Sequence, residues 1–318
     1  PPEVGYSPSV SGIALNFNRV HFEWKQTASG YATTMDSRSQ KYRPAVQVAR
    51  MKVTQRDLPV YTYKPSNGRD NRTVARGALG KGGARWLPVR HPEMYAGDVF
   101  QTFSRSFGIA LKSPVRAKTR PSGLILVRNQ SAQLVEIARS MLRYSTNLTA
   151  EMVGLTATRA WGKMPVTLAA SAKEMSRWAE AKYGVKGIKL LDHSGLGGGS
   201  RVQAVALASV LARGDARHTL EPLLKEFSLR KKDGKVDKNH PIKVFAKTGT
   251  LNFVSGLGGY LRRGQKELVF VILSADVPRR NKIKKADRAR PQGARAWNKR
   301  AKTLQQVLIE RWGTHLVG

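Results

Sequence analysis

The sequence predicts an α+β protein, and three observations lead to this class. The first 92 residues contain short runs in which apolar and polar residues alternate, residues 92–214 carry apolar residues at helical spacing, and residues 243–273 return to strands. Helices followed by antiparallel strands and one closing helix indicate a sheet with helices packed on it. We therefore place a boundary after residue 92, between a β-rich module and an α+β domain.

The β-rich module begins with residues 11–18, which we expect to run into residues 20–24 as a half-buried strand. Further short strands are predicted at residues 45–48 and 60–63. Proline, glycine and asparagine separate these runs, as is typical of an irregular all-β module.

The middle of the chain predicts five helices, at residues 92–108, 132–144, from about 149, 168–184 and 200–214. Pro92 suits a helix first turn, and Ser200 is the expected N-cap of the fifth helix. Strands are predicted at 243–251, 256–261 and 268–273, with a tight hairpin at 262–265. An amphipathic helix around residues 304–312 closes the chain.

Composition excludes several classes of protein. The chain has 318 residues, with 56 Lys plus Arg against 21 Asp plus Glu, a formal charge of +35. Because 41% of the residues are hydrophobic, the chain is not a disordered tail. The absence of cysteine excludes disulfides, thiolate nucleophiles and cysteine-based metal sites. No apolar run is long enough to span a bilayer. The sequence opens at Pro1 without methionine or a signal peptide, so we expect a mature, truncated or partly observed polypeptide.

Two short motifs draw attention to catalysis. Ser145-Thr146-Asn147 falls between two predicted helices, and Lys247-Thr248-Gly249 falls in a predicted strand. Alone, the first motif usually caps a helix and the second usually ends a strand. Together and in this order, they are two of the three signatures of active-site-serine penicillin-binding enzymes.

The surrounding residues resemble one family more closely. Residues 144–152, 192–196 and 247–251 are similar to segments of the class C low-molecular-mass penicillin-binding proteins, the D-alanyl-D-alanine carboxypeptidase/endopeptidase family. Residues 10–18 resemble part of the β-rich insertion within that family's catalytic domain. The similarity covers nearly the whole chain except the basic segment after Asp276.

The resemblance implies a fold and a division into domains. Residues 93–318 would form a transpeptidase-like α+β domain, an antiparallel sheet with helices on both faces, ending in a basic segment (279–302) and a C-terminal helix. Residues 1–92 would be the C-terminal remainder of the inserted domain.

The family's nucleophile lies in a Ser-x-x-Lys motif, which has no match ahead of Ser145 in this sequence. The chain contains one match, Ser228-Leu229-Arg230-Lys231, in a charged stretch between the other two motifs, and we interpret it as chance. We expect the nucleophile and its lysine upstream of Pro1.

The resemblance also implies roles for six residues. Ser145 would relay a proton between the missing lysine and the departing amine, and Asn147 would hold the substrate carbonyl. Lys247 would keep the pocket positive and orient Ser145. Thr248 and Thr250 would bind the terminal carboxylate of the substrate, and the Thr250 N–H would donate to the oxyanion. Gly249 would let substrate lie against the strand.

Other residues could suggest a catalytic, metal-binding or phosphate-binding function, but each has a simpler structural explanation. Asp192, His193 and Ser194 are the residue types of a triad, but neighbours in sequence point apart, and the resemblance makes this segment a turn beside the site. The six histidines lack metal-ligand spacing, so we predict no metal and no cofactor. The glycines at 195 and 197–199 are expected in a flexible loop, because no phosphate-loop Gly-Lys-Ser/Thr follows.

The basic surplus is concentrated in residues 279–302. Such a run could bind nucleic acid through phosphates, but no recognition module accompanies it, and a solvated tail or loop explains it more simply. We interpret the charge as an aid to localisation, through peripheral contact with an anionic wall or membrane surface.

These observations lead to one hypothesis and two alternatives. The hypothesis is a periplasmic serine-type D-alanyl-D-alanine carboxypeptidase/endopeptidase, acting on peptidoglycan stem peptides that end in D-Ala-D-Ala and inhibited by β-lactams. The alternatives are a non-catalytic peptidoglycan-binding protein of the same fold and a basic nucleic-acid-binding protein.

Overall fold

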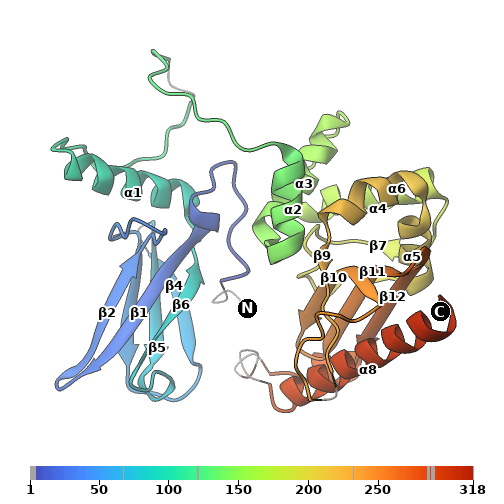
Figure 1. The fold of residues 1–318 in the computed structure, drawn as a ribbon. Helices are drawn as coiled ribbons and strands as arrows, with labels where there is room; N and C mark the ends of the chain where they lie inside the picture. The colour runs from blue at the N-terminus through green and yellow to red at the C-terminus, as the bar shows by residue number, and fades with distance from the viewer. Residues whose placement is uncertain are drawn as a thin grey trace. The chain divides into compact units, whose positions relative to one another are not determined.

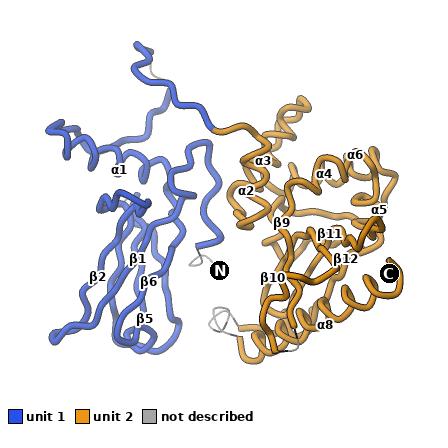
Figure 2. The backbone as a smooth tube through the Cα atoms, viewed as in Figure 1, with its two compact units in different colours: residues 1–131 blue, residues 132–318 orange. Residues whose placement is uncertain are grey.

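A computed structural model describes residues 5–66, 68–119, 122–231, 233–284, 287 and 291–317. The chain forms two compact units, residues 1–131 and 132–318 (Figure 2). Each unit has its own hydrophobic core.

The first unit contains two three-stranded sheets (Figure 1). The first sheet has the order β2-β1-β6 and is antiparallel, with β1 at Arg19–Thr27, β2 at Gly30–Asp36 and β6 at Gly82–Pro88. The second has the order β3-β5-β4, with β3 at Ala49–Thr54, β4 at Tyr61–Ser66 and β5 at Arg69–Ala75. In the second sheet, β3 is parallel to β5 and β4 is antiparallel to it. Fully buried apolar side chains fill the core, among them Val20, Phe22, Val74, Leu87 and Val89.

Helix α1 (Pro92–Ser106) belongs to the first unit, because two of its buried polar side chains form hydrogen bonds with the backbone of the β-rich part. The buried carboxylate of Asp98 accepts hydrogen bonds from the backbone N–H groups of Gln47 (2.6 Å) and Val48 (2.9 Å). The hydroxyl of Tyr95 donates to the carbonyl of Arg19 at 2.8 Å. The compact units therefore divide after residue 131, whereas the sequence boundary was placed after residue 92.

Two predicted strands of this unit are wrong in position. Residues 11–18 form a loop that ends in the single 3-10 turn η1 (Asn16–Asn18), in which Phe17 has a φ of 57°. The buried side chain of Asn18 holds this turn, because it accepts the Leu15 N–H and donates to the Ser9 carbonyl. Residues 45–48 contain one isolated bridge at Ala45, and the strand begins at Ala49. Residues 20–24 and most of 60–63 lie in strands as predicted.

The second unit is built on an antiparallel sheet of order β12-β11-β10-β9. Its strands are β9 (Lys225–Glu226), β10 (Lys243–Leu251), β11 (Val254–Arg263) and β12 (Lys266–Ala275). Helix α8 (Ala294–His315) covers one face, where Ile309 packs with Val244, Leu257 and Leu261. Helix α5 (Ala204–Ala212) covers the other face, where the Tyr260 hydroxyl donates to the Leu211 carbonyl at 2.9 Å. The predicted α+β class, with helices on both faces of an antiparallel sheet, is confirmed.

The remaining elements of this unit are α2 (Leu134–Tyr144), α3 (Asn147–Ala160), α4 (Leu168–Tyr183), β7 (Ile188–Lys189), β8 (Arg201–Val202), α6 (Gly214–Leu220), η3 (Glu221–Leu223) and α7 (Val277–Asn281). The predicted N-cap at Ser200 is wrong, because the Ser200 hydroxyl accepts the Leu191 N–H and the helix begins at Ala204. Residues 201–202 instead pair with β7. The predicted hairpin at 262–265 is confirmed, with Gly264 at a φ of 58° in the turn.

The basic segment is not a free tail where the structure describes it. Arg279 lies over the Phe253 ring at 4.7 Å, and Arg280 donates to the Asn252 carbonyl at 2.8 Å. Residues 294–302 form the first turns of α8. Lys285, Arg288 and Arg290 lie outside the described residues. Among the helices described, none is both long and apolar enough to cross a bilayer.

Candidate active site

Ser145 lies at the junction of α2 and α3 in a conformation that serine rarely adopts. Its φ of 55° and ψ of 50° are left-handed, and its N–H closes α2 on the Met141 carbonyl. A left-handed residue with a Cβ costs roughly 1–2 kcal/mol, and glycine usually takes this position at a helix end. Strain of this kind is found at sites where the surrounding structure holds a residue for function.

Lys247 reaches Ser145 from β10, 102 residues further along the chain. Its Nζ donates to the Ser145 hydroxyl at 2.5 Å and to the Thr248 carbonyl at 2.6 Å. The fold therefore brings together the two motifs that the sequence analysis paired.

The surroundings of Lys247 disfavour its charged form. Burial lowers the pKa of its ammonium group, and among the described residues no carboxylate forms an ion pair with it. The cross-strand neighbour of Lys247 on β11 is Gly258, and Gly249 faces Gly256 in the same register. Because Gly256 and Gly258 have no side chains, β11 places no side chain directly opposite Lys247 and Gly249.

The other predicted site residues lie close by in sequence and on the same two elements. Asn147 is the first residue of α3, and Thr248, Gly249 and Thr250 continue β10 from Lys247 as exposed residues. A Cβ added at Gly249 would meet no heavy atom within 4 Å, so the space above this strand is clear. An extended peptide could lie along β10 in that space.

A buried polar network next to this junction connects α3, α4 and the loop around His193. Its central residue, Glu151, was not among the residues predicted from the sequence. The carboxylate of Glu151, which is 5% exposed, accepts the backbone N–H groups of His193 and Ser194, each at 3.0 Å. The His193 ring meets the Ser171 hydroxyl at 2.8 Å, and that hydroxyl meets Thr158 at 2.7 Å. A glutamate near the start of a helix is ordinary in sequence, so no local signal marked Glu151.

The segment 192–194 is a turn, as the resemblance implied, and its three side chains form no relay. The Asp192 carboxylate accepts the N–H groups of Gly195, at 2.8 Å, and Gly197. The His193 ring bonds to Ser171 on α4, and burial lowers the pKa of the imidazole. The His193 ring therefore contacts a residue that holds the fold together and takes no part in a catalytic relay.

Ser228 and Lys231 do not form a Ser-x-x-Lys site. They lie beyond β9 in extended chain, with Leu229 buried between them and Arg230 bridged to Val236. Residues three apart share a face on a helix but not on extended chain. This geometry agrees with the interpretation that the match to Ser-x-x-Lys at this place arises by chance.

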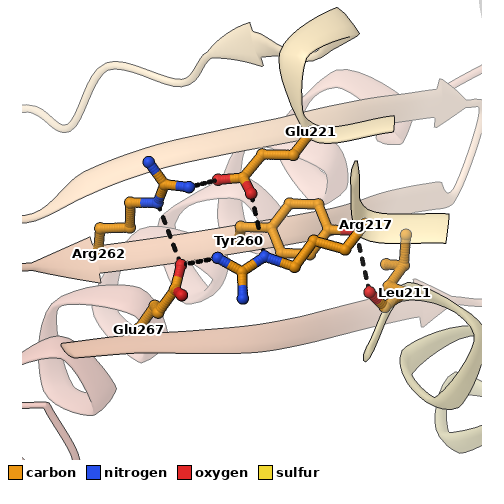
Figure 3. Close-up of polar contacts among 6 residues, drawn as sticks. All are labelled: Leu211, Arg217, Glu221, Tyr260, Arg262 and Glu267. Carbon is orange, nitrogen blue, oxygen red and sulfur yellow. Dashed lines mark hydrogen bonds and ion pairs between the residues drawn. The ribbon is translucent and has the colours of Figure 1, made fainter. Parts of the chain in front are cut away.

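A neighbouring network on the same sheet shows how the protein neutralises other cations (Figure 3). Arg217 pairs with Glu221 and Glu267, and Arg262 pairs with the same two carboxylates. A cavity of about 590 Å³ beside it is lined by Gly214, Arg217, His218, Glu221, Pro222, Phe245 and Arg262. Neither Ser145 nor Lys247 lines this cavity. Among the described residues, no three His, Asp or Glu side chains are grouped to hold a metal ion.

Comparison with solved structures defines the class of fold. The structure resembles penicillin binding protein 4 from Haemophilus influenzae, with a TM-score of 0.65 and 18% identity over 86% of this chain and 63% of that one. The same protein complexed with a β-lactam gives a TM-score of 0.64 and 18% identity, over 85% of this chain and 65% of that one. The chain thus has the penicillin-binding protein 4 fold and spans about two thirds or less of the length of these relatives.

The sequence profile of the D-Ala-D-Ala carboxypeptidase 3 (S13) family matches residues 2–293. The chain belongs to this family. The match extends past Asp276, so the first part of the basic segment lies within the family region, contrary to our expectation. No curated protein matches the sequence.

Proposed function

We propose that this chain carries part of the active site of a penicillin-binding serine hydrolase that acts on peptidoglycan. The finer reaction that we propose is D-alanyl-D-alanine carboxypeptidase or endopeptidase cleavage of stem peptides, through an acyl-enzyme, in the periplasm. The observation that carries the proposal is the contact between Lys247 and Ser145.

The geometry of this contact supports a proton-transfer role. The Lys247 ammonium group donates to the Ser145 hydroxyl, so it would hold that oxygen in place and leave its own proton free to be given away. Ser145 would give this hydroxyl proton to the departing amine of the substrate and take a replacement from the lysine of the missing Ser-x-x-Lys motif. Asn147, two residues further on, would hold the substrate carbonyl.

The exposed residues of β10 would bind the end of the substrate. Thr248 and Thr250 supply hydroxyl groups beside the positive charge of Lys247, an arrangement that favours a terminal carboxylate. The open surface over Gly249 would admit the peptide backbone. β-Lactams, which mimic such a terminus, would acylate the same enzyme as inhibitors.

The nucleophile is the part of the proposal that the chain does not supply. We propose that a serine outside these 318 residues forms the acyl-enzyme, with Ser145 as relay. The alternative function, a peptidoglycan-binding protein without catalysis, is favoured by the lack of Ser-x-x-Lys ahead of Ser145.

Labelling with a fluorescent penicillin separates these possibilities. We expect the complete gene product to be labelled and the 318-residue chain to remain unlabelled. Lys247→Ala in the complete product should slow acylation at least 100-fold, since it removes the group that positions the Ser145 relay, and a positioned proton-transfer group contributes roughly 10²–10⁴. Lys243→Ala, which removes an exposed lysine from the same strand, should change it less than twofold.

Two results would contradict the proposal. An unlabelled complete product would favour the non-catalytic binding protein. Labelling of the 318-residue chain at Ser145 would make Ser145 the nucleophile and remove its role as relay.

A further inference from the structure

The outward face of α8 carries a stripe of four residues that the fold does not use. Arg300, Leu304, Val307 and Arg311 lie at positions i, i+4, i+7 and i+11, which fall on one side of an α-helix. Ala301, Gln305 and Ile309 are buried on the opposite side, against the sheet. Leu304 is 49% exposed and Val307 is 51% exposed. We call these four residues the outer stripe.

Within the described parts of the chain, the arginines and lysines of this helix have no acidic partner. Arg295, Lys299, Arg300, Lys302 and Arg311 are all exposed, and none forms an ion pair with a described residue. The single acid of the helix, Glu310, accepts a hydrogen bond from Gln306. On the other face of the same sheet, Arg217 and Arg262 are neutralised by two glutamates. Among the described residues, the cations on the exposed surface of α8 therefore lack acidic partners, whereas Arg217 and Arg262 of the same unit are paired with glutamates.

The order of residues along the stripe distinguishes between anionic partners. Two arginines flank a leucine and a valine, so the apolar side chains lie in the middle of the charged strip. A helix with basic and apolar side chains on one face suits the boundary between lipid headgroups and acyl chains. A sugar–phosphate polymer would pair with the arginines but would gain nothing from Leu304 and Val307. Single-stranded nucleic acid would instead favour stacking aromatic side chains, which the stripe lacks.

We propose that the outer stripe of α8 docks this unit on the surface of an anionic lipid bilayer. Arg300 and Arg311 bind lipid phosphates, with Lys299 next to Arg300, while Leu304 and Val307 enter the headgroup boundary. Helix α8 covers one face of its sheet (Figure 1), so the docked bilayer lies on that side of the sheet. Lys247 alternates along β10 with Val244 and Ala246, which face α8, so it lies on the other face, away from the bilayer. The inference does not depend on the proposed enzymatic activity.

Co-sedimentation of the full 318-residue chain with vesicles tests this surface. One set of vesicles contains phosphatidylcholine alone, and the other contains phosphatidylcholine with about one third phosphatidylglycerol. We expect binding to the anionic vesicles only, weakening as salt rises because exposed charges are screened.

Two double variants divide the contributions of charge and insertion. Arg300→Gln/Arg311→Gln should weaken binding to anionic vesicles roughly 30-fold, since each basic residue near such a surface is worth about 1 kcal/mol. Leu304→Ser/Val307→Ser should weaken it at least fivefold with the net charge unchanged. Arg159→Gln/Arg213→Gln removes two exposed arginines from other helix ends and should weaken it less than threefold. Unchanged melting temperatures would show that all variants fold.

Three outcomes would overturn the proposal. Equal losses in the control and the arginine variant would mean diffuse attraction by the net charge. Full binding by Leu304→Ser/Val307→Ser would mean that no side chain inserts. Equal affinity for duplex DNA and for anionic vesicles, lost in the arginine variant alone, would identify a general polyanion surface.

Discussion

Helix α3 connects two polar clusters that differ in how their groups are satisfied. At its start, Ser145 is strained and Lys247 is desolvated without a carboxylate partner. One turn further on, Glu151 meets two backbone N–H groups, and His193, Ser171 and Thr158 continue the network. The first cluster costs folding free energy, whereas the second stabilises the fold. Opposite responses to substitution are therefore expected.

The largest expected effect is a loss of stability when the buried cluster around Glu151 is disrupted. Glu151→Ala removes two charge-assisted hydrogen bonds, each worth about 1.5–3 kcal/mol, so we expect a loss of at least about 3 kcal/mol in the free energy of unfolding. Urea denaturation measures this loss. Glu174→Ala, which breaks a surface ion pair with Arg177, should cost less than about 1 kcal/mol. Equal losses in both variants would remove the distinction between the clusters.

The next effect concerns the close approach of α3 to His193. A Cβ at Gly154 would lie 2.2 Å from the His193 ring, so Gly154→Ala should destabilise the fold by about 1–3 kcal/mol through overpacking. Gly249→Ala is the matched control, because its Cβ would meet nothing within 4 Å. We expect Gly249→Ala to leave the melting temperature nearly unchanged but to slow acylation by penicillin in the complete product. A stability loss at Gly249 equal to that at Gly154 would contradict this assignment.

Substitution at the strained serine should have the opposite sign. Ser145→Gly relieves the left-handed strain, and we expect it to raise the free energy of unfolding by up to about 1 kcal/mol. The same variant should lose penicillin acylation, since the hydroxyl that contacts Lys247 is gone. Thermal melts and labelling of one preparation give both results. A destabilised Ser145→Gly protein would show that Ser145 is a structural cap.

The smallest expected effect is a pH-dependent change in melting temperature when Lys247 is replaced. Since burial lowers the pKa of this lysine in the folded protein, its protonated form opposes folding at neutral pH. Lys247→Met should therefore raise the melting temperature at pH 7, and the gain should shrink as pH rises toward 10.5, where the lysine of the unfolded chain also loses its proton. Melts between pH 7 and 9.5 measure the trend. A gain independent of pH would mean that packing, and not charge, is responsible.

Sequence patterns predicted the helices and the long strands well where the apolar spacing was regular, as in α1, α4 and β10. They failed where side chains hold irregular backbone. The turn at Asn18 and the short pairing of Arg201–Val202 with Ile188–Lys189 depend on contacts between distant segments. The candidate site was predicted by motif order, but Glu151 was not, because its function as a buried acceptor depends on which loop lies against it.

By itself, the sequence determined the class of fold and the pair of motifs around Ser145 and Lys247, because periodicity and motif order are properties of neighbouring residues. Only the tertiary structure decided that these motifs meet at 2.5 Å, that α1 packs with the β-rich unit, and that no described acidic residue pairs with the cations of α8. Contacts between residues far apart in the chain decide burial, desolvation and partners, and no local pattern encodes them.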